Sequence, residues 1–161
     1  MSSVHNRGRI LRWQGEGPLP TIPYVNFASE MLKCFEDYED KVALVDASSG
    51  KSYTYRQLQT KISQMKKSLV SAGVNQGDAV LMVCRNHIDT PAALLTILHI
   101  GAICVPVGTD LTIGELTHIV GVSKARWAVV TEGSVTKVTE AFSSYDSSSS
   151  SATLDSGSCI G

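Results

Sequence analysis

The sequence has almost no excess of charge of either sign. Its 161 residues contain 14 lysines and arginines against 15 aspartates and glutamates, so the formal net charge is −1. Proteins bind nucleic acids and anionic membranes through clustered positive charge, so neither is expected as a partner. Hydrophobic residues make up 43% of the chain, a share typical of globular proteins. The length suits one domain of about 150 residues.

Cysteine and histidine are sparse and lack the spacing of metal ligands. The four cysteines form no C-x-x-C pair and the four histidines no H-x-x-x-H pair, so a metal site has no support. Three of the cysteines fall in apolar segments. We therefore expect the buried, reduced thiols of an intracellular protein rather than disulfides. The cysteines are Cys34, Cys84, Cys104 and Cys159. The histidines are His5, His87, His99 and His118.

The longest uncharged run, the 20 residues between Asp89 and Asp110, is interrupted. A membrane-spanning helix needs about 20 consecutive apolar residues, but Gly101 and Pro106 divide this run. The two parts read as an apolar helix over 91–100 and a buried strand over 102–105. We therefore expect no transmembrane segment.

The chain also lacks a recognisable secretory or peroxisomal signal. Residues 1–15 hold three arginines and no acidic residue, but no apolar stretch of the kind that secretion requires. An acid-poor start with arginines also fits a mitochondrial transit peptide, whereas three nearby prolines favour an irregular extension over residues 1–25. The last residues are not Ser-Lys-Leu, so we expect an intracellular, cytoplasmic protein.

Helices and strands alternate over residues 26–142. Asn26 is placed to cap a first helix, and Thr54 and Thr112 each open the spacing of a capping box. Gly73 is placed to end the second helix. Apolar or alternating segments predict strands over 42–46, 52–55, 79–84, 102–105 and 126–131. This order predicts an α/β fold with a mostly parallel sheet.

The composition changes at residue 143. Residues 143–161 include nine serines and few apolar side chains, so burial cannot offset the entropy of ordering them. We expect a disordered tail. The run Ser147–Ser151 looks superficially like a phosphate cradle, but no lysine or arginine follows Lys137 and no strand–loop–helix pattern surrounds it.

The familiar catalytic motifs are absent. The sequence has no G-x-G-x-x-G, no G-x-x-x-x-G-K-[ST] and no G-x-S-x-G. His87 follows the strand predicted over 79–84, at the edge where open α/β sheets bind ligands; it is either functional or an ordinary turn residue. His99 and His118 are interpreted as histidines at the edge of the core. The acidic run 36–40 and Lys61, Lys66 and Lys67 are interpreted as solvated helix faces. No catalytic, cofactor-binding or metal residue is predicted.

Six motifs in order nevertheless resemble one family. They are Lys41–Asp46, Tyr53–Leu58, Gly73–Asp78, Gly101–Pro106, Thr112–His118 and Ala125–Thr131. Together they resemble the opening of the AMP-forming acyl-CoA synthetases. Residues 22–26 add a likeness to the branch of 4-coumarate–CoA ligases and luciferases. The likeness covers residues 22–135.

The resemblance implies a ligase that uses ATP and Mg²⁺ to form an acyl-adenylate and then transfers the acyl group to coenzyme A. In this family the chemistry depends on a Ser/Thr/Gly-rich loop ending in Pro-Lys-Gly, a Thr-Glu pair, a ribose-binding aspartate and a lysine of a C-terminal domain. None of these occurs in the chain, and the matching residues are caps, turns and strand cores. We therefore expect an incomplete N-terminal subdomain over 26–142 that is inactive alone and binds no cofactor.

Two other functions stay open. A non-catalytic form of the protein could associate with itself or with a full-length paralogue through unpaired sheet edges. The chain could also be an unrelated small α/β nucleotide-binding domain.

Overall fold

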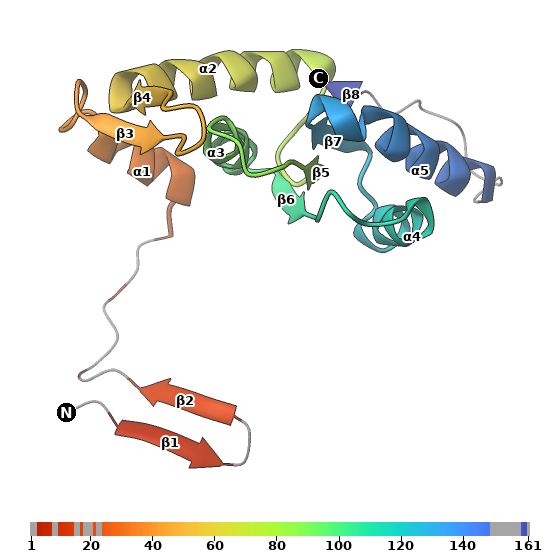
Figure 1. Cartoon of the computed structure of the whole chain (residues 1–161), viewed down its shortest axis with the longest axis horizontal. Helices are drawn as coiled ribbons and strands as arrows, with labels where there is room; N and C mark the ends of the chain where they lie inside the picture. Colours follow the sequence, from red (N-terminus) through yellow and green to blue (C-terminus); the bar gives the residue numbers. More distant parts are fainter. Residues whose placement is uncertain are drawn as a thin grey trace.

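A computed structural model describes residues 3–7, 10–14, 17, 21, 24–148 and 159–160 (Figure 1). The elements are, in order, β1 (Ser3–Arg7), β2 (Ile10–Gln14), α1 (Phe27–Phe35), β3 (Val42–Val45), β4 (Ser52–Thr54), α2 (Tyr55–Ala72), β5 (Ala79–Val83), α3 (Thr90–Ile100), β6 (Ile103–Pro106), α4 (Ile113–Ser123), β7 (Trp127–Val130), the 3-10 turn η1 (Glu132–Ser134), α5 (Val135–Ser148) and β8 (Cys159–Ile160). No helix in the described part of the chain is long and apolar enough to cross a membrane.

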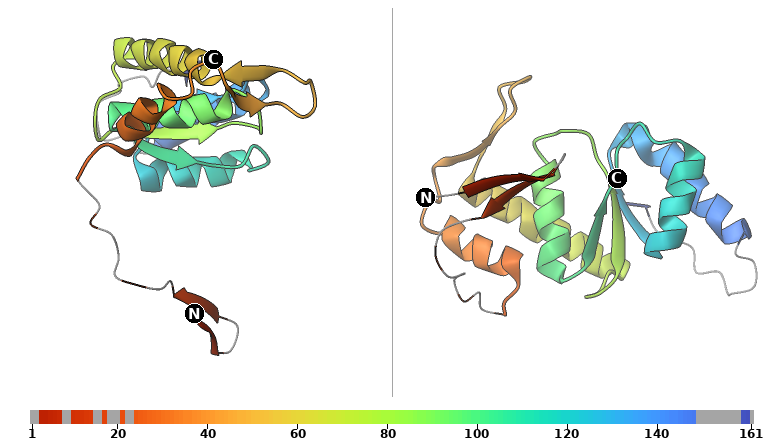
Figure 2. Two further views of the ribbon diagram at one scale, coloured as in Figure 1. Left: turned by 90° about the vertical axis from the view of Figure 1, so that its left-hand side faces the viewer. Right: turned by 90° about the horizontal axis from the view of Figure 1, so that it is seen from below.

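A four-stranded parallel sheet forms the centre of the molecule, in the order β6-β5-β7-β8. Strand β5 contributes side chains to both faces. Leu81 and Val83 pack with helices α4 and α5 on one face, whereas Val80 and Met82 pack with α2 and α3 on the other. The ribbon views show these helix pairs on opposite faces of the sheet (Figure 2). Burial on both faces explains why β5 reads as a continuous apolar run. The predicted α/β fold with a mostly parallel sheet is confirmed.

A third apolar cluster joins α1 to the rest of the domain. Leu32 and Phe35 of α1 pack against Leu58 and Ile62 of α2 and against Leu95 of α3. Strands β3 and β4 form a separate antiparallel pair beside this cluster. The cluster therefore ties the first helix and hairpin to the helices on one face of the sheet.

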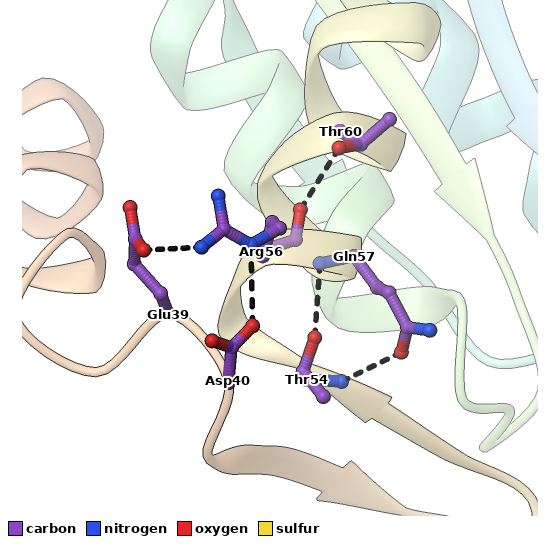
Figure 3. A network of polar contacts seen from close by, with 6 residues as sticks. All are labelled: Glu39, Asp40, Thr54, Arg56, Gln57 and Thr60. Atoms are coloured by element: carbon purple, nitrogen blue, oxygen red, sulfur yellow. Dashed lines mark hydrogen bonds and ion pairs between the residues drawn. The ribbon is translucent and has the colours of Figure 1, made fainter.

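The predicted helix ends are confirmed. Thr54 Oγ1 accepts the N–H of Gln57 at 3.2 Å, and Gln57 Oε1 accepts the N–H of Thr54 at 2.9 Å, so α2 begins with a capping box (Figure 3). Helix α4 begins with a second capping box, formed by Thr112 and Glu115. Helix α2 ends at Gly73, whose φ of 107° lies in the left-handed region that glycine adopts without strain.

The acidic residues 36–40 form turns after α1, so their prediction as a helix face was wrong. Arg56 of α2 binds Glu39 through Nη2 and Asp40 through Nε, the latter at 3.2 Å (Figure 3). The hydrogen bond to Asp40 and the charge of Glu39 raise the pKa of Arg56. These ion pairs hold the turn against the first turn of α2.

Both ends of the chain contain structure that the sequence did not predict. Residues 3–7 and 10–14 pair as an antiparallel hairpin, not as an irregular extension, because Val, Ile and Trp are residue types that favour strands. Past the boundary expected at residue 142, α5 continues to Ser148 and residues 159–160 pair with β7. The rest of the predicted tail, 149–158 and 161, lies outside the described residues.

Candidate site at the carboxyl edge of the parallel sheet

A cavity of about 360 Å³ opens where strands β5 and β7 end. Strand β5 pairs with both β6 and β7. Its following helix, α3, covers one face of the sheet, while α5, which follows β7, covers the other. The two connections diverge between β5 and β7, which makes this point the topological switch of the sheet. Open α/β sheets bind their ligands at such points.

The cavity has an apolar wall built by two helices and a strand. Met65 and Leu69 come from α2, Ala93 from α3 and Val129 from β7. The same four residues belong to the apolar cluster on this face of the sheet. Cavities of roughly 300–1,000 Å³ with mostly apolar walls are typical of small-molecule sites.

A polar cluster lies at the rim of the cavity. Lys61 Nζ of α2 lies 2.8 Å from Asp89 Oδ1, at the start of α3. Tyr53 of β4 donates its hydroxyl hydrogen to the same Oδ1 at 3.0 Å, and Lys61 donates to the Tyr53 oxygen at 3.1 Å. Lys61 and Asp89 are each 32% exposed. Lys61 is therefore half-buried in an ion pair, and its prediction as a solvated residue was wrong.

The cluster favours the charged forms of both partners. Burial of Asp89 opposes its ionisation, but hydrogen bonds from Lys61 and Tyr53 outweigh burial and lower the pKa of the carboxyl group. The hydrogen bond to Asp89 raises the pKa of Lys61, and burial only partly offsets it. At neutral pH, Lys61 is therefore protonated and Asp89 is ionised.

His87 lies on the wall of this cavity, at the strand end where the sequence suggested a ligand. Its Nδ1 accepts the backbone N–H of Asp89 at 3.3 Å and lies 3.5 Å from Asp89 Oδ2. The imidazole is half exposed. The structure therefore places His87 at the same cavity as Asp89 and Lys61, two residues that the sequence analysis had not linked to it.

Among the described cysteines and remaining histidines, Cys84 alone lies at this cavity. Cys84 lines the cavity, but burial raises the pKa of its thiol, and the Sγ–H donates to Val129 O at 3.6 Å. Cys34 is exposed, so the prediction that it is buried was wrong. His99 is partly buried, as expected, whereas His118 is exposed. No three His, Cys, Asp or Glu residues among those described are grouped to hold a metal ion.

Comparisons with known proteins identify the family. The profile described as "AMP-binding enzyme" matches residues 33–159, beyond the end at 135 expected from the sequence. A 4-coumarate–CoA ligase-like protein of Oryza sativa is 33% identical over 107 residues, which are 66% of this chain and 19% of that protein.

Two solved structures share the fold. One is a benzoate CoA ligase from Burkholderia xenovorans, with a TM-score of 0.69 and 28% identity over 74% of this chain and 24% of the other. The other is the luciferase-like enzyme of Zophobas morio, with a TM-score of 0.74 and 22% identity. That match covers 83% of this chain and 31% of the luciferase-like chain. Against the sequence relatives compared, the chain spans between 2% and 19% of their length. The chain belongs to the AMP-binding enzyme family and corresponds to part of the N-terminal region of its acyl-CoA ligase-like members.

Proposed function

We propose that this chain is the scaffold part of an acyl-CoA synthetase-type ligase and that the 161-residue polypeptide does not catalyse the reaction by itself. In the complete enzyme, ATP and Mg²⁺ would activate a carboxylic acid as an acyl-adenylate, and coenzyme A would then accept the acyl group. The observation that supports the proposal is the family match over residues 33–159. That stretch contains the parallel sheet but no Pro-Lys-Gly sequence.

The start of α3 is poorly suited to hold the phosphates of ATP. Helix N-termini bind phosphate through free backbone N–H groups, but Pro91 has none, and the N–H of Thr90 donates to His87 O at 3.0 Å. The carboxylate of Asp89 stands at the same helix end and would repel a phosphate. The cavity at the sheet edge therefore does not replace the missing phosphate-binding loop.

ATP–pyrophosphate exchange by the purified chain, with Mg²⁺ and a panel of aromatic and fatty acids, tests this proposal. We expect no exchange above a heat-denatured control. A chimera provides the positive arm: residues 1–148 of this chain, which keep α5 whole, would be joined to the remainder of the rice 4-coumarate–CoA ligase-like protein. We expect this chimera to exchange pyrophosphate. Mg²⁺-dependent exchange by the chain alone, or a folded chimera without activity, would contradict the proposal.

A non-catalytic role in association is the second candidate, and the edge at β7 favours it. Among the described residues, β8 pairs with β7 at Ala128 and Val129 alone, and an incompletely paired sheet edge can accept another strand. Light scattering during size-exclusion chromatography would show a dimer or larger species if this role is correct, whereas a stable monomer would argue against it. The third alternative, an unrelated nucleotide-binding domain, gains no support from the family membership.

A further inference from the structure

The rim of the cavity keeps one hydrogen-bond donor unused. A lysine ammonium group has three N–H donors, and within the described part of the chain Lys61 uses two of them. One reaches Asp89 Oδ1 at 2.8 Å and the other the Tyr53 hydroxyl at 3.1 Å. The third remains for a molecule in the cavity that Lys61 lines.

An acceptor remains beside this donor. Asp89 Oδ1 accepts from both Lys61 and Tyr53, whereas Oδ2 has His87 Nδ1 as its described neighbour, at 3.5 Å. That nitrogen accepts the backbone N–H of Asp89, and within the described part of the chain the hydrogen bonds to the Asp89 carboxylate end on Oδ1. The ion pair therefore presents an N–H and a carboxylate oxygen side by side.

The charges of the pair select against a charged ligand. A ligand carboxylate that approached Lys61 would also meet Asp89, and a ligand ammonium that approached Asp89 would meet Lys61. In either case the ligand is repelled by the group of like charge. The group of opposite charge does not compensate for this repulsion, because it is already paired within the protein. An uncharged group with one acceptor and one donor satisfies both open positions at once. A carboxamide has this pattern.

We propose that this cavity binds a small uncharged molecule whose apolar body packs on Met65, Leu69 and Ala93 and whose carboxamide bonds to Lys61 Nζ and Asp89 Oδ2. The inference is independent of the proposed ligase function, because it concerns binding to this chain alone. An apolar wall that meets a few convergent polar groups is the usual composition of a small-molecule site.

Three probes of similar size and different charge test the proposal: benzamide, benzoate and benzylammonium. Titration of the ¹⁵N-labelled full chain, followed by amide chemical shifts, is expected to show saturable binding of benzamide with the largest shifts at Ala93, Leu69 and Thr131. Benzoate and benzylammonium are expected to bind at least tenfold more weakly. Equal binding of either charged probe, shifts centred elsewhere, or no saturation by benzamide would overturn the proposal.

Two variants and a matched control locate the site. Lys61→Met is expected to weaken benzamide binding at least tenfold, whereas Lys67→Met, an exposed lysine of the same helix, is expected to leave it unchanged. Ser68→Phe adds a ring from an exposed position on the cavity wall and is expected to block binding even if Lys61→Met fails to fold. Equal affinity of Ser68→Phe and the unaltered chain would place the ligand outside the cavity.

Discussion

Asp89 joins three parts of the fold through one carboxylate. Tyr53 belongs to β4 and Lys61 to α2, while Asp89 itself stands at the start of α3. Because the pKa of Asp89 is lowered in the folded protein, its ionised form stabilises the fold. This contribution is present above the ordinary aspartate pKa of about 3.9 and is lost as the pH falls through the lowered value.

We expect Asp89→Asn to lower the free energy of unfolding at pH 7 by about 1 kcal/mol, the size of a typical hydrogen-bonded contribution, and to have little effect near pH 2. Urea denaturation at the two pH values measures the difference. Asp37→Asn, an exposed residue in the turn after α1, is the control and should cost little at either pH. A cost of Asp89→Asn that does not shrink in acid would contradict the assigned role.

Single residues of the candidate site could be only partly predicted from the sequence. The position of His87 after β5 follows from the order of elements, because parallel strands present their carboxyl ends at one edge. The half-burial of Lys61 does not follow, because it depends on how β4 and α3 pack against α2. The sequence shows only that Lys61 is next to the apolar Ile62, at the border of an apolar helix face. In the structure Ile62 is fully buried.

At the scale of elements, the capping boxes connect sequence to structure most directly. In α4, Thr112 Oγ1 accepts the N–H of Glu115 at 3.3 Å, and Glu115 Oε2 accepts the N–H of Thr112 at 2.8 Å. These bonds satisfy backbone donors that have no partner within the helix. The motif is local, so four residues of sequence were enough to predict it.

Removal of the cap side chain should therefore destabilise the domain. Thr112→Ala is expected to lower the free energy of unfolding by about 1 kcal/mol, the typical cost of losing a threonine N-cap. Thr112→Ser keeps the hydroxyl and should change it by much less. Urea denaturation followed by circular dichroism would measure both, and equal losses in the two variants would exclude the cap as the cause.

At the scale of the whole molecule, the two edges of the parallel sheet differ. The N–H of Ile103 in β6 donates to the O of Asp78, the residue before β5, and the N–H of Val107, the residue after β6, donates to Met82 O. Successive residues of a strand point their backbone N–H groups to opposite sides. The N–H positions of residues 104 and 106 therefore point away from β5, toward the open edge. Pro106 has no N–H, which leaves this edge with little capacity to bind another strand.

Pro106→Ala restores an outward donor and is expected to increase self-association through β6. Sedimentation velocity over a concentration series should show dimers at lower concentration than in the unaltered chain. Pro91→Ala, which changes a proline in the first turn of α3, controls for the loss of proline itself. Identical sedimentation of Pro106→Ala and the unaltered chain would show that Pro106 does not protect the edge.

The overall architecture could be predicted because alternating apolar strands and helices already define a parallel α/β sheet. The ends could not. The hairpin β1–β2 depends on pairing between weakly patterned segments, and β8 is too short to give a sequence pattern. The continuation of α5 to Ser148 was missed because serine-rich composition outweighed the helical spacing of the preceding residues.

The position of β7 also affects how the chain folds during synthesis. Strand β5 pairs with β6 on one side and with β7 on the other, where Val80 faces Trp127, 47 positions later. At about 5–20 residues per second, a ribosome needs roughly 2–10 seconds to synthesise that interval. During that time at least one side of β5 has no partner strand. A chaperone that recognises exposed apolar strands therefore has its longest opportunity to bind between the synthesis of β5 and that of β7.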